Sequence, residues 1–179
     1  MKKLILLLLL ISNTVFAQIH NPVSWSTKVE KVNELEYDLI ATATIESNWH
    51  LYSQNITEEG PYGAPIPTTF NFTKTDDFEL VGDVKEEEGH TINDPVFQIP
   101  IKYFDTKADF KQRVKITSKK TIKIEGTVEF MVCDDSNCLP PDEVDLVFNI
   151  QLNNAVNSVA PAKQDKSLDF INTKTETPK

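Results

Sequence analysis

Hydrophobic and polar residues alternate with a two-residue period along most of the chain. In residues 35–46 one face of an extended segment carries only apolar side chains, namely Leu35, Tyr37, Leu39, Ala41, Ala43 and Ile45, and the other face is mostly polar. This pattern is typical of a β-strand with one buried face. Seven further segments show it: 23–32, 67–74, 78–84, 97–104, 110–117, 120–132 and 143–152. Eight short strands without a helical period predict an all-β chain folded as an antiparallel β-sandwich.

The two ends of the chain do not follow this alternation. Residues 1–17 contain a cationic start, an apolar run from Leu4 to Ile11 and a small residue at Ala17, the layout of a secretory signal peptide. The apolar run is much shorter than the roughly 20 residues needed to span a bilayer. We therefore expect cleavage after about Ala17 and an exported protein. Residues 153–179 are polar and aperiodic, which predicts a flexible tail after a single domain at 18–152.

The charge balance limits the possible partners. Cleavage removes two lysines and no acidic residue, so 16 basic and 27 acidic residues remain, a net charge of −11. Such a surface repels nucleic acids and anionic lipids at long range. Neither class of partner is therefore expected, and we expect no stable membrane insertion after signal removal.

Both cysteines lie in one short segment, MVCDDSNCLPP. The residues between Cys133 and Cys138 favour a tight turn, and strand-like residues stand on both sides. Facing Cα atoms at the base of such a hairpin lie about 4.5–5.5 Å apart, within the span of a disulfide. The alternation of strand 120–132 places Cys133 on its more polar face, provided that Gly126 does not introduce a bulge.

Three kinds of chemistry fit a close cysteine pair. A structural disulfide closing so small a ring contributes roughly 2 kcal/mol, less than a bridge between distant strands would. A metal site would need further ligands, but His20, His50 and His90 have no metal-binding spacing relative to the cysteines, so no metal is expected. A dithiol that cycles with its disulfide needs two cysteines close enough to bridge. The residues alone leave the structural and the cycling pair open.

The segment VEFMVCDDSNCLPPDEVDLVF resembles the periplasmic N-terminal domain of DsbD-type transmembrane disulfide reductases. SNWHLYSQN, an aromatic turn after an early strand, and PVFQIPIKYF, a strand entered from an acidic loop, support the same resemblance. Together they cover most of residues 23–152. The resemblance implies an immunoglobulin-like β-sandwich whose two cysteines relay electrons.

The resemblance also implies roles for the two cysteines and for partners. Cys138 would attack and form mixed disulfides, and Cys133 would resolve them, without any cofactor. Electrons would come from a membrane-embedded disulfide reductase or its thioredoxin-like domain. They would pass to exported thioredoxin-like proteins, including those that serve disulfide isomerisation and cytochrome c maturation. This would make the chain a component of a protein-disulfide reductase system. The alternative is a non-enzymatic binding module that carries a structural hairpin disulfide and binds through residues 53–67 and 85–95.

The chain departs from the family pattern around the cysteines. It has four residues between them where the family has five, and its acidic loop at 85–95 lacks the aromatic residue with which the family caps the pair. We take Trp49 and Tyr52 as candidates for the wall of the cysteine pocket. Glu88 and His90 of the acidic loop are candidates for the cap. His50 is interpreted as a surface histidine.

Overall fold

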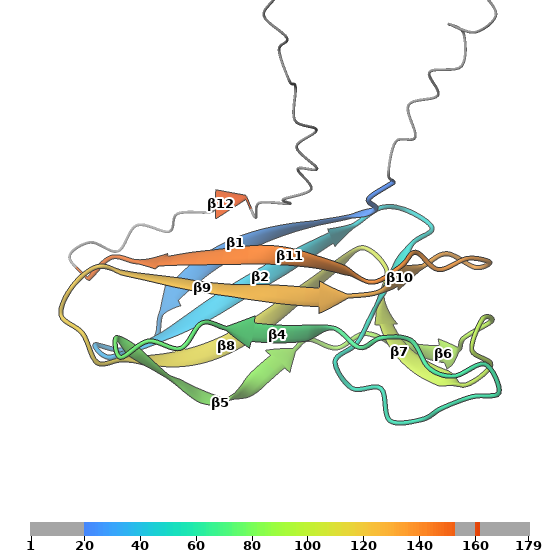
Figure 1. The fold of residues 1–179 in the computed structure, drawn as a ribbon, viewed down its shortest axis with the longest axis horizontal. Coiled ribbons are helices and arrows are strands. Elements are labelled where there is room, and N and C mark those ends of the chain that lie inside the picture. The colour runs from blue at the N-terminus through green and yellow to red at the C-terminus, as the bar shows by residue number, and fades with distance from the viewer. Residues whose placement is uncertain (1–19, 153–159, 162–179) are drawn as a thin grey trace, which may run out of the picture.

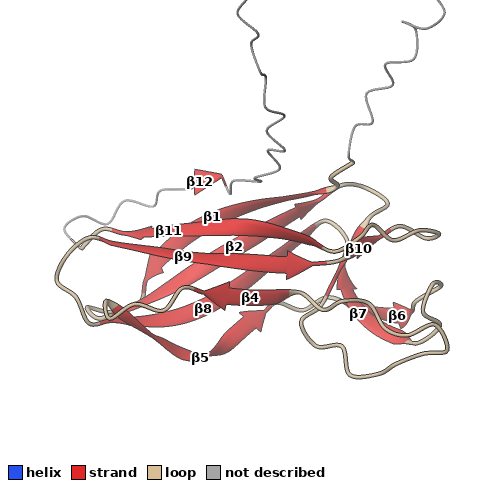
Figure 2. Cartoon of the chain, viewed as in Figure 1, coloured by secondary structure: helices blue, strands red, loops and turns tan. Residues whose placement is uncertain are grey.

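The computed structural model describes residues 20–152 and 160–161, and side chains within 20–152. The described residues form strands joined by turns and loops (Figure 2). Among them there is no helix long and apolar enough to cross a membrane. The signal peptide expected at 1–17 lies outside the described residues.

The structure contains a strand within each of the eight segments predicted from the sequence. The strands are β1 (Val23–Lys31), β2 (Glu36–Ile45), β3 (His50–Tyr52), β4 (Thr69–Phe72), β5 (Phe78–Glu86), β6 (His90–Asn93), β7 (Pro100–Phe104), β8 (Lys107–Ile116), β9 (Ile122–Phe130), β10 (Val132–Cys133), β11 (Asp142–Ile150) and β12 (Ala160–Pro161). The short strands β3, β6, β10 and β12 were not predicted, because a few residues give no recognisable alternation.

Two sheets pack face to face and enclose the main core (Figure 1). One has the strand order β12-β1-β2-β8-β5 and the other β11-β9-β4, and all their pairings are antiparallel. The hydroxyl of Thr27 in β1 donates a 2.7 Å hydrogen bond to the carbonyl oxygen of Val147 in β11, so the sheets are also joined at this edge. The predicted fold, an immunoglobulin-like antiparallel β-sandwich, is confirmed.

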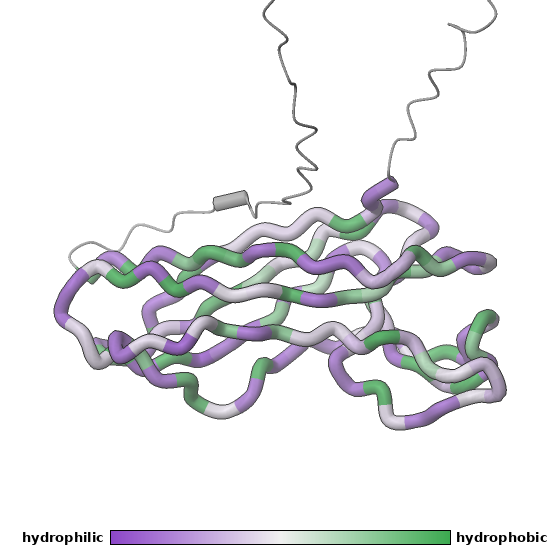
Figure 3. The backbone as a smooth tube through the Cα atoms, viewed as in Figure 1, coloured by the Kyte–Doolittle hydropathy of each residue, from purple (hydrophilic) through white to green (hydrophobic). Residues whose placement is uncertain are grey.

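The main core follows from the alternation along the strands (Figure 3). Trp25 of β1 lies at its centre, 4% exposed, and its ring contacts Phe70, Phe110 and Phe130 at centroid distances of 6.1, 5.7 and 5.4 Å. Both sheets contribute to this aromatic cluster, so its burial holds them together. Leu35 was predicted to face the core, but it is 54% exposed because it lies in the turn before β2.

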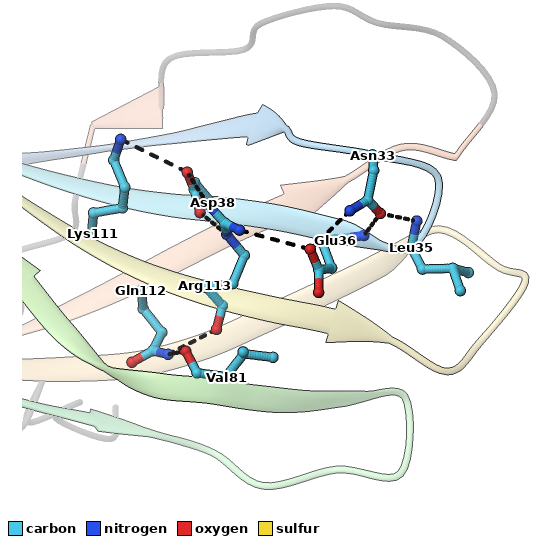
Figure 4. Close-up of polar contacts among 8 residues, drawn as sticks. All are labelled: Asn33, Leu35, Glu36, Asp38, Val81, Lys111, Gln112 and Arg113. Atoms are coloured by element: carbon cyan, nitrogen blue, oxygen red, sulfur yellow. Dashed lines mark hydrogen bonds and ion pairs between the residues drawn. The ribbon is translucent and has the colours of Figure 1, made fainter.

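Charged side chains of β2 and β8 pair on the outer face of the larger sheet (Figure 4). Arg113 of β8 lies opposite Asp38 of β2 and binds both of its carboxyl oxygens, and Lys111 lies 3.7 Å from the same carboxyl group. The neighbouring Gln112 points the other way and is buried. Its side-chain amide donates to the carbonyl oxygen of Gly82 at the irregularity in β5.

A third sheet, with the order β10-β3-β7-β6, lies at one end of the sandwich (Figure 1). It carries a second, smaller cluster of buried residues: Tyr52, Phe97, Ile99, Ile101 and Cys133. Residues 85–95 were expected to be one long loop. The structure shows instead that β5 continues to Glu86 and that His90–Asn93 forms β6 against β7.

The strand expected at 97–104 begins three residues later than predicted. Asp94 accepts hydrogen bonds on Oδ1 from the amides of Val96 and Phe97, at 2.8 and 2.9 Å. Its main-chain oxygen accepts a further bond from Gln98, which has a φ of 60°. The carboxyl group of Asp94 thus stabilises a turn here in place of an extended strand, because it accepts hydrogen bonds from two backbone amides.

Residues 160–161 form β12 on the outer edge of β1. Ala160 lies opposite Thr27 and Pro161 opposite Ser26. The other residues of the tail predicted at 153–179 lie outside the described part, so the flexible tail stays a prediction.

Candidate functional site

The two cysteines are joined by a disulfide across the predicted hairpin turn. Their Cα atoms lie 4.0 Å apart, and the two residues form an isolated antiparallel bridge. The turn closes through a 2.9 Å hydrogen bond from the amide of Asp134 to the carbonyl oxygen of Asn137. Oδ1 of Asp134 accepts from the amides of Ser136 and Asn137, at 2.7 and 2.6 Å. These bonds from the backbone lower the pKa of Asp134, whose charged form therefore stabilises the turn.

The two sulfur-bearing residues differ in accessibility. Cys133 is 0% exposed, whereas Cys138 is only partly buried. Gly126 stays in register with Leu146 on one side and Phe72 on the other, so no bulge interrupts β9, and Cys133 leaves the main core face as predicted. The expectation that it faces a polar side was wrong, because the second cluster covers it.

A buried polar network lies beside the disulfide. The hydroxyl of Tyr52 donates a 2.8 Å hydrogen bond to Oδ2 of Asp94 and lies 3.2 Å from Nε2 of His50. Nε2 of His50 is also 3.7 Å from Oδ2 of Asp94, and the His50 ring packs 4.8 Å from the ring of Tyr103. Tyr52 is 0% exposed and Asp94 1%, so the network is shielded from water.

Burial sets the protonation of this network. It lowers the pKa of His50 below the ordinary value of 6.5, although the carboxyl groups of Asp94, Asp135, Asp134 and Asp105 act in the opposite direction. Burial and the hydrogen bond to Asp94 raise the pKa of Tyr52 far above its ordinary value. His50 is thus neutral and Tyr52 protonated near pH 7. The interpretation of His50 as a surface residue was wrong, because it is 7% exposed.

The structure brings one of the four candidate pocket and cap residues into contact with the cysteines. Tyr52 shares the second cluster with Cys133 and Cys138. Trp49 packs instead against the main core, and the centroid of the His20 ring lies 5.3 Å from that of Trp49. Glu88 is exposed, and so is His90, whose Nε2 lies 3.8 Å from Asp105 and whose ring lies 6.1 Å from that of Tyr103.

Glu86 anchors the loop at 53–67 next to this site. It accepts hydrogen bonds from the hydroxyl of Ser53 at 2.5 Å and from the amide of Gln54 at 2.9 Å, and Lys102 lies 3.0 Å away. Burial opposes its ionisation, but these bonds outweigh burial and lower the pKa of Glu86. Further along the loop, Gly60 approaches the turn after Asp94 so closely that a Cβ atom would overlap the carbonyl oxygen of Phe97. The loop and the turn therefore pack as one unit.

The prolines that follow Cys138 line a mostly apolar cavity of about 280 Å³. Its walls are formed by His20, Asn21, Pro22, Phe130, Val132, Leu139, Pro140, Pro141 and Asp142. Leu139, the residue after Cys138, is part of this wall. Within the described residues, no group of His, Cys, Asp or Glu side chains is arranged to hold a metal ion.

Three site residues were not identified from the sequence: His50 as a buried group, Asp94 and Tyr103. The three residues of β3 are too few for a recognisable alternation. Asn93-Asp94-Pro95 is a recognisable turn signal. That signal does not say that β3 and the turn meet.

Comparisons with known proteins agree with this geometry. Residues 24–149 match the sequence profile described as "Thiol:disulfide interchange protein DsbD, N-terminal". A search of curated protein sequences gave no significant match.

Solved structures show more distant likeness. The reduced N-terminal domain of DsbD from Neisseria meningitidis has 11% identity and a TM-score of 0.48 over 78% of this chain and 90% of its own. The N-terminal periplasmic domain of ScsB from Proteus mirabilis has 16% identity and a TM-score of 0.46 over 80% of this chain and 54% of its own. Since both TM-scores are below 0.5, the assignment depends on the profile match. That match covers more than half of the chain, and the chain therefore belongs to the family of DsbD N-terminal domains.

Proposed function

We propose that this protein is a thiol-disulfide relay that works through Cys133 and Cys138. It accepts electrons from a membrane-embedded disulfide reductase, or its thioredoxin-like domain, and reduces exported thioredoxin-like proteins. The observation that carries the proposal is a disulfide across a single turn in which Cys133 is buried and Cys138 is partly exposed. Membership of the family supports thiol-disulfide interchange as the chemistry.

The same family supports a periplasmic location, because DsbD N-terminal domains are periplasmic. In that compartment disulfides form and persist. Cleavage of a signal peptide after about Ala17 would release the domain there.

The exchange proceeds in two steps. The thiolate of Cys138 attacks one sulfur of the partner's disulfide, a mixed disulfide forms, and the partner's other sulfur leaves as a thiolate. The thiolate of Cys133 then attacks the sulfur of Cys138, which closes the intramolecular disulfide and releases the second partner sulfur. Two electrons pass to the partner, which takes up two protons. The same steps in reverse reduce the Cys133–Cys138 disulfide again and oxidise the dithiol of the donor.

The difference in exposure between the two cysteines supports this division of roles. A partner's disulfide can reach the partly exposed Cys138, whereas Cys133 is covered by the second cluster. The disulfide closes a ring of only a few residues, so its reduction should lower the stability of the fold by only roughly 2 kcal/mol. The main core lies between the two large sheets and includes neither cysteine, so we expect the sandwich to stay folded in both redox states.

Covalent trapping tests the proposal. Cys133→Ala should accumulate mixed disulfides with exported thioredoxin-like proteins, since nothing resolves them, and Cys138→Ala should accumulate far fewer. The double alanine variant is the matched control for non-covalent association. If neither single variant captures a partner, the proposal fails, and the alternative of a binding module with a structural disulfide is favoured.

A further inference from the structure

We propose that His50 is the proton acceptor of Cys133 and thereby drives the resolving step, an inference that rests on the proposed function. The structure places it in the strand next to the cysteine hairpin.

The register of the strands brings the two residues together. His50 of β3 lies directly opposite Cys133 of β10 in an antiparallel pair. Opposed residues in such a pair project from the same face, with Cβ atoms about 4.5–5.5 Å apart. Cys133 in turn lies opposite Cys138. The three residues therefore form a row, with the buried Cys133 between His50 and the partly exposed Cys138.

The hydrogen bonds of Tyr52 fix the tautomer of the imidazole. Its phenol has a single hydrogen, which it donates to Oδ2 of Asp94. At His50 the phenol oxygen can therefore only accept, so Nε2 carries the ring hydrogen. The other nitrogen, Nδ1, then holds the lone pair, and it makes no hydrogen bond within residues 20–152.

A covered thiol needs such an acceptor. Apolar surroundings disfavour a thiolate, and the side chains around Cys133 are mostly apolar. Burial keeps His50 neutral near pH 7, so its lone pair is available. The titratable groups that face the imidazole are Tyr52 of β3, Tyr103 of β7, Asp94 of the turn before β7, Asp105 after β7, and Asp134 and Asp135 of the cysteine hairpin. The carboxyl groups of the four aspartates stabilise the imidazolium once it has formed.

The step balances without any further reactant. Nδ1 of His50 takes the proton of the Cys133 thiol, giving an imidazolium and a thiolate. The thiolate attacks the Cys138 sulfur of the mixed disulfide, the Cys133–Cys138 bond forms, and the partner's sulfur leaves with the bonding electron pair. The imidazolium then gives its proton to that leaving thiolate or to water.

Stopped-flow reaction of the reduced protein with excess dithiobis(nitrobenzoate) separates the two steps. Attack by Cys138 releases the first nitrothiobenzoate, and ring closure by Cys133 releases the second. His50→Gln should slow the second release about 10-fold or more and leave the first within about twofold. Lys123→Gln, at an exposed side chain at the start of β9, should leave both rates unchanged. A second release in His50→Gln within twofold of wild type would overturn the proposal.

A pH profile gives an independent readout. In the wild-type protein the closure rate should rise through the lowered pKa of His50 and then level off, while in His50→Gln it should keep rising into the alkaline range. If His50→Gln does not fold, the wild-type profile decides alone, and a profile without an inflection below pH 6.5 overturns the proposal. The reagent needs no physiological partner. Failure to trap exported proteins would therefore refute the proposed function without affecting this result.

Discussion

Tyr52 and Asp94, which lie 42 residues apart in the chain, are joined by a 2.8 Å hydrogen bond in the cluster that covers Cys133. Asp94 also holds the turn before β7 through its other carboxyl oxygen. The Asp94 carboxyl group therefore holds the turn that packs near Cys133 and positions the Tyr52 phenol that contacts His50.

Removal of the phenol hydroxyl should destabilise the fold. Tyr52→Phe leaves Oδ2 of Asp94 and Nε2 of His50 without their shared partner in a buried site, which costs about 1–3 kcal/mol. Urea denaturation of the oxidised protein measures the free energy of unfolding. Tyr37→Phe is the matched control, because Tyr37 is also buried, and we expect it to be nearly neutral. Equal losses in the two variants would contradict a structural role for the network.

The stability contributed by Glu86 should depend on pH. Its folded pKa lies below the unfolded value of about 4.5, so its contribution is fully present above that pH and is lost as the pH falls through the folded pKa. Glu86→Gln should therefore cost about 1–3 kcal/mol at pH 7 and less at pH 3. Unfolding curves at both pH values test this.

A control for Glu86 is available on the same strand. Glu79 of β5 is exposed, and Glu79→Gln should change stability little at either pH. A loss in Glu86→Gln that stays constant between pH 7 and pH 3 would show that packing, rather than the charge, is responsible.

The turn between the cysteines should set how readily the disulfide closes. Asp134→Ala removes the acceptor for the amides of Ser136 and Asn137, whereas Asp135→Ala removes the same charge without breaking those bonds. We expect the equilibrium constant for ring closure to fall about threefold to tenfold more in Asp134→Ala than in Asp135→Ala. Equilibration with glutathione buffers measures both constants. Equal effects would mean that charge dominates over turn geometry.

Alternation predicted the sandwich because the long strands β1, β2, β8, β9 and β11 each place one face in the main core. It also gave the correct phase at Cys133, since β9 runs without a bulge past Gly126. It could not show what covers the outer side of β10. That cover depends on where β3, β7 and the turn after Asp94 meet.

The polar network could not be predicted, because its members are distant in the sequence. His50 begins a strand of only three residues, too short to establish which side is buried. Asp94 reaches Tyr52 from a turn that replaces the first residues of the strand expected at 97–104. The hairpin itself was predictable because it is local: four turn-forming residues suffice to bring its cysteines together.

The reduction potential of the Cys133–Cys138 pair tests the central claim most directly. Equilibration of the folded domain with glutathione or dithiothreitol buffers, followed by thiol alkylation, gives the value. If the pair exchanges with redox partners, we expect a potential above about −300 mV, with the sandwich folded in both states. A potential below that value, or unfolding on reduction, would mean that the bridge only holds the hairpin together.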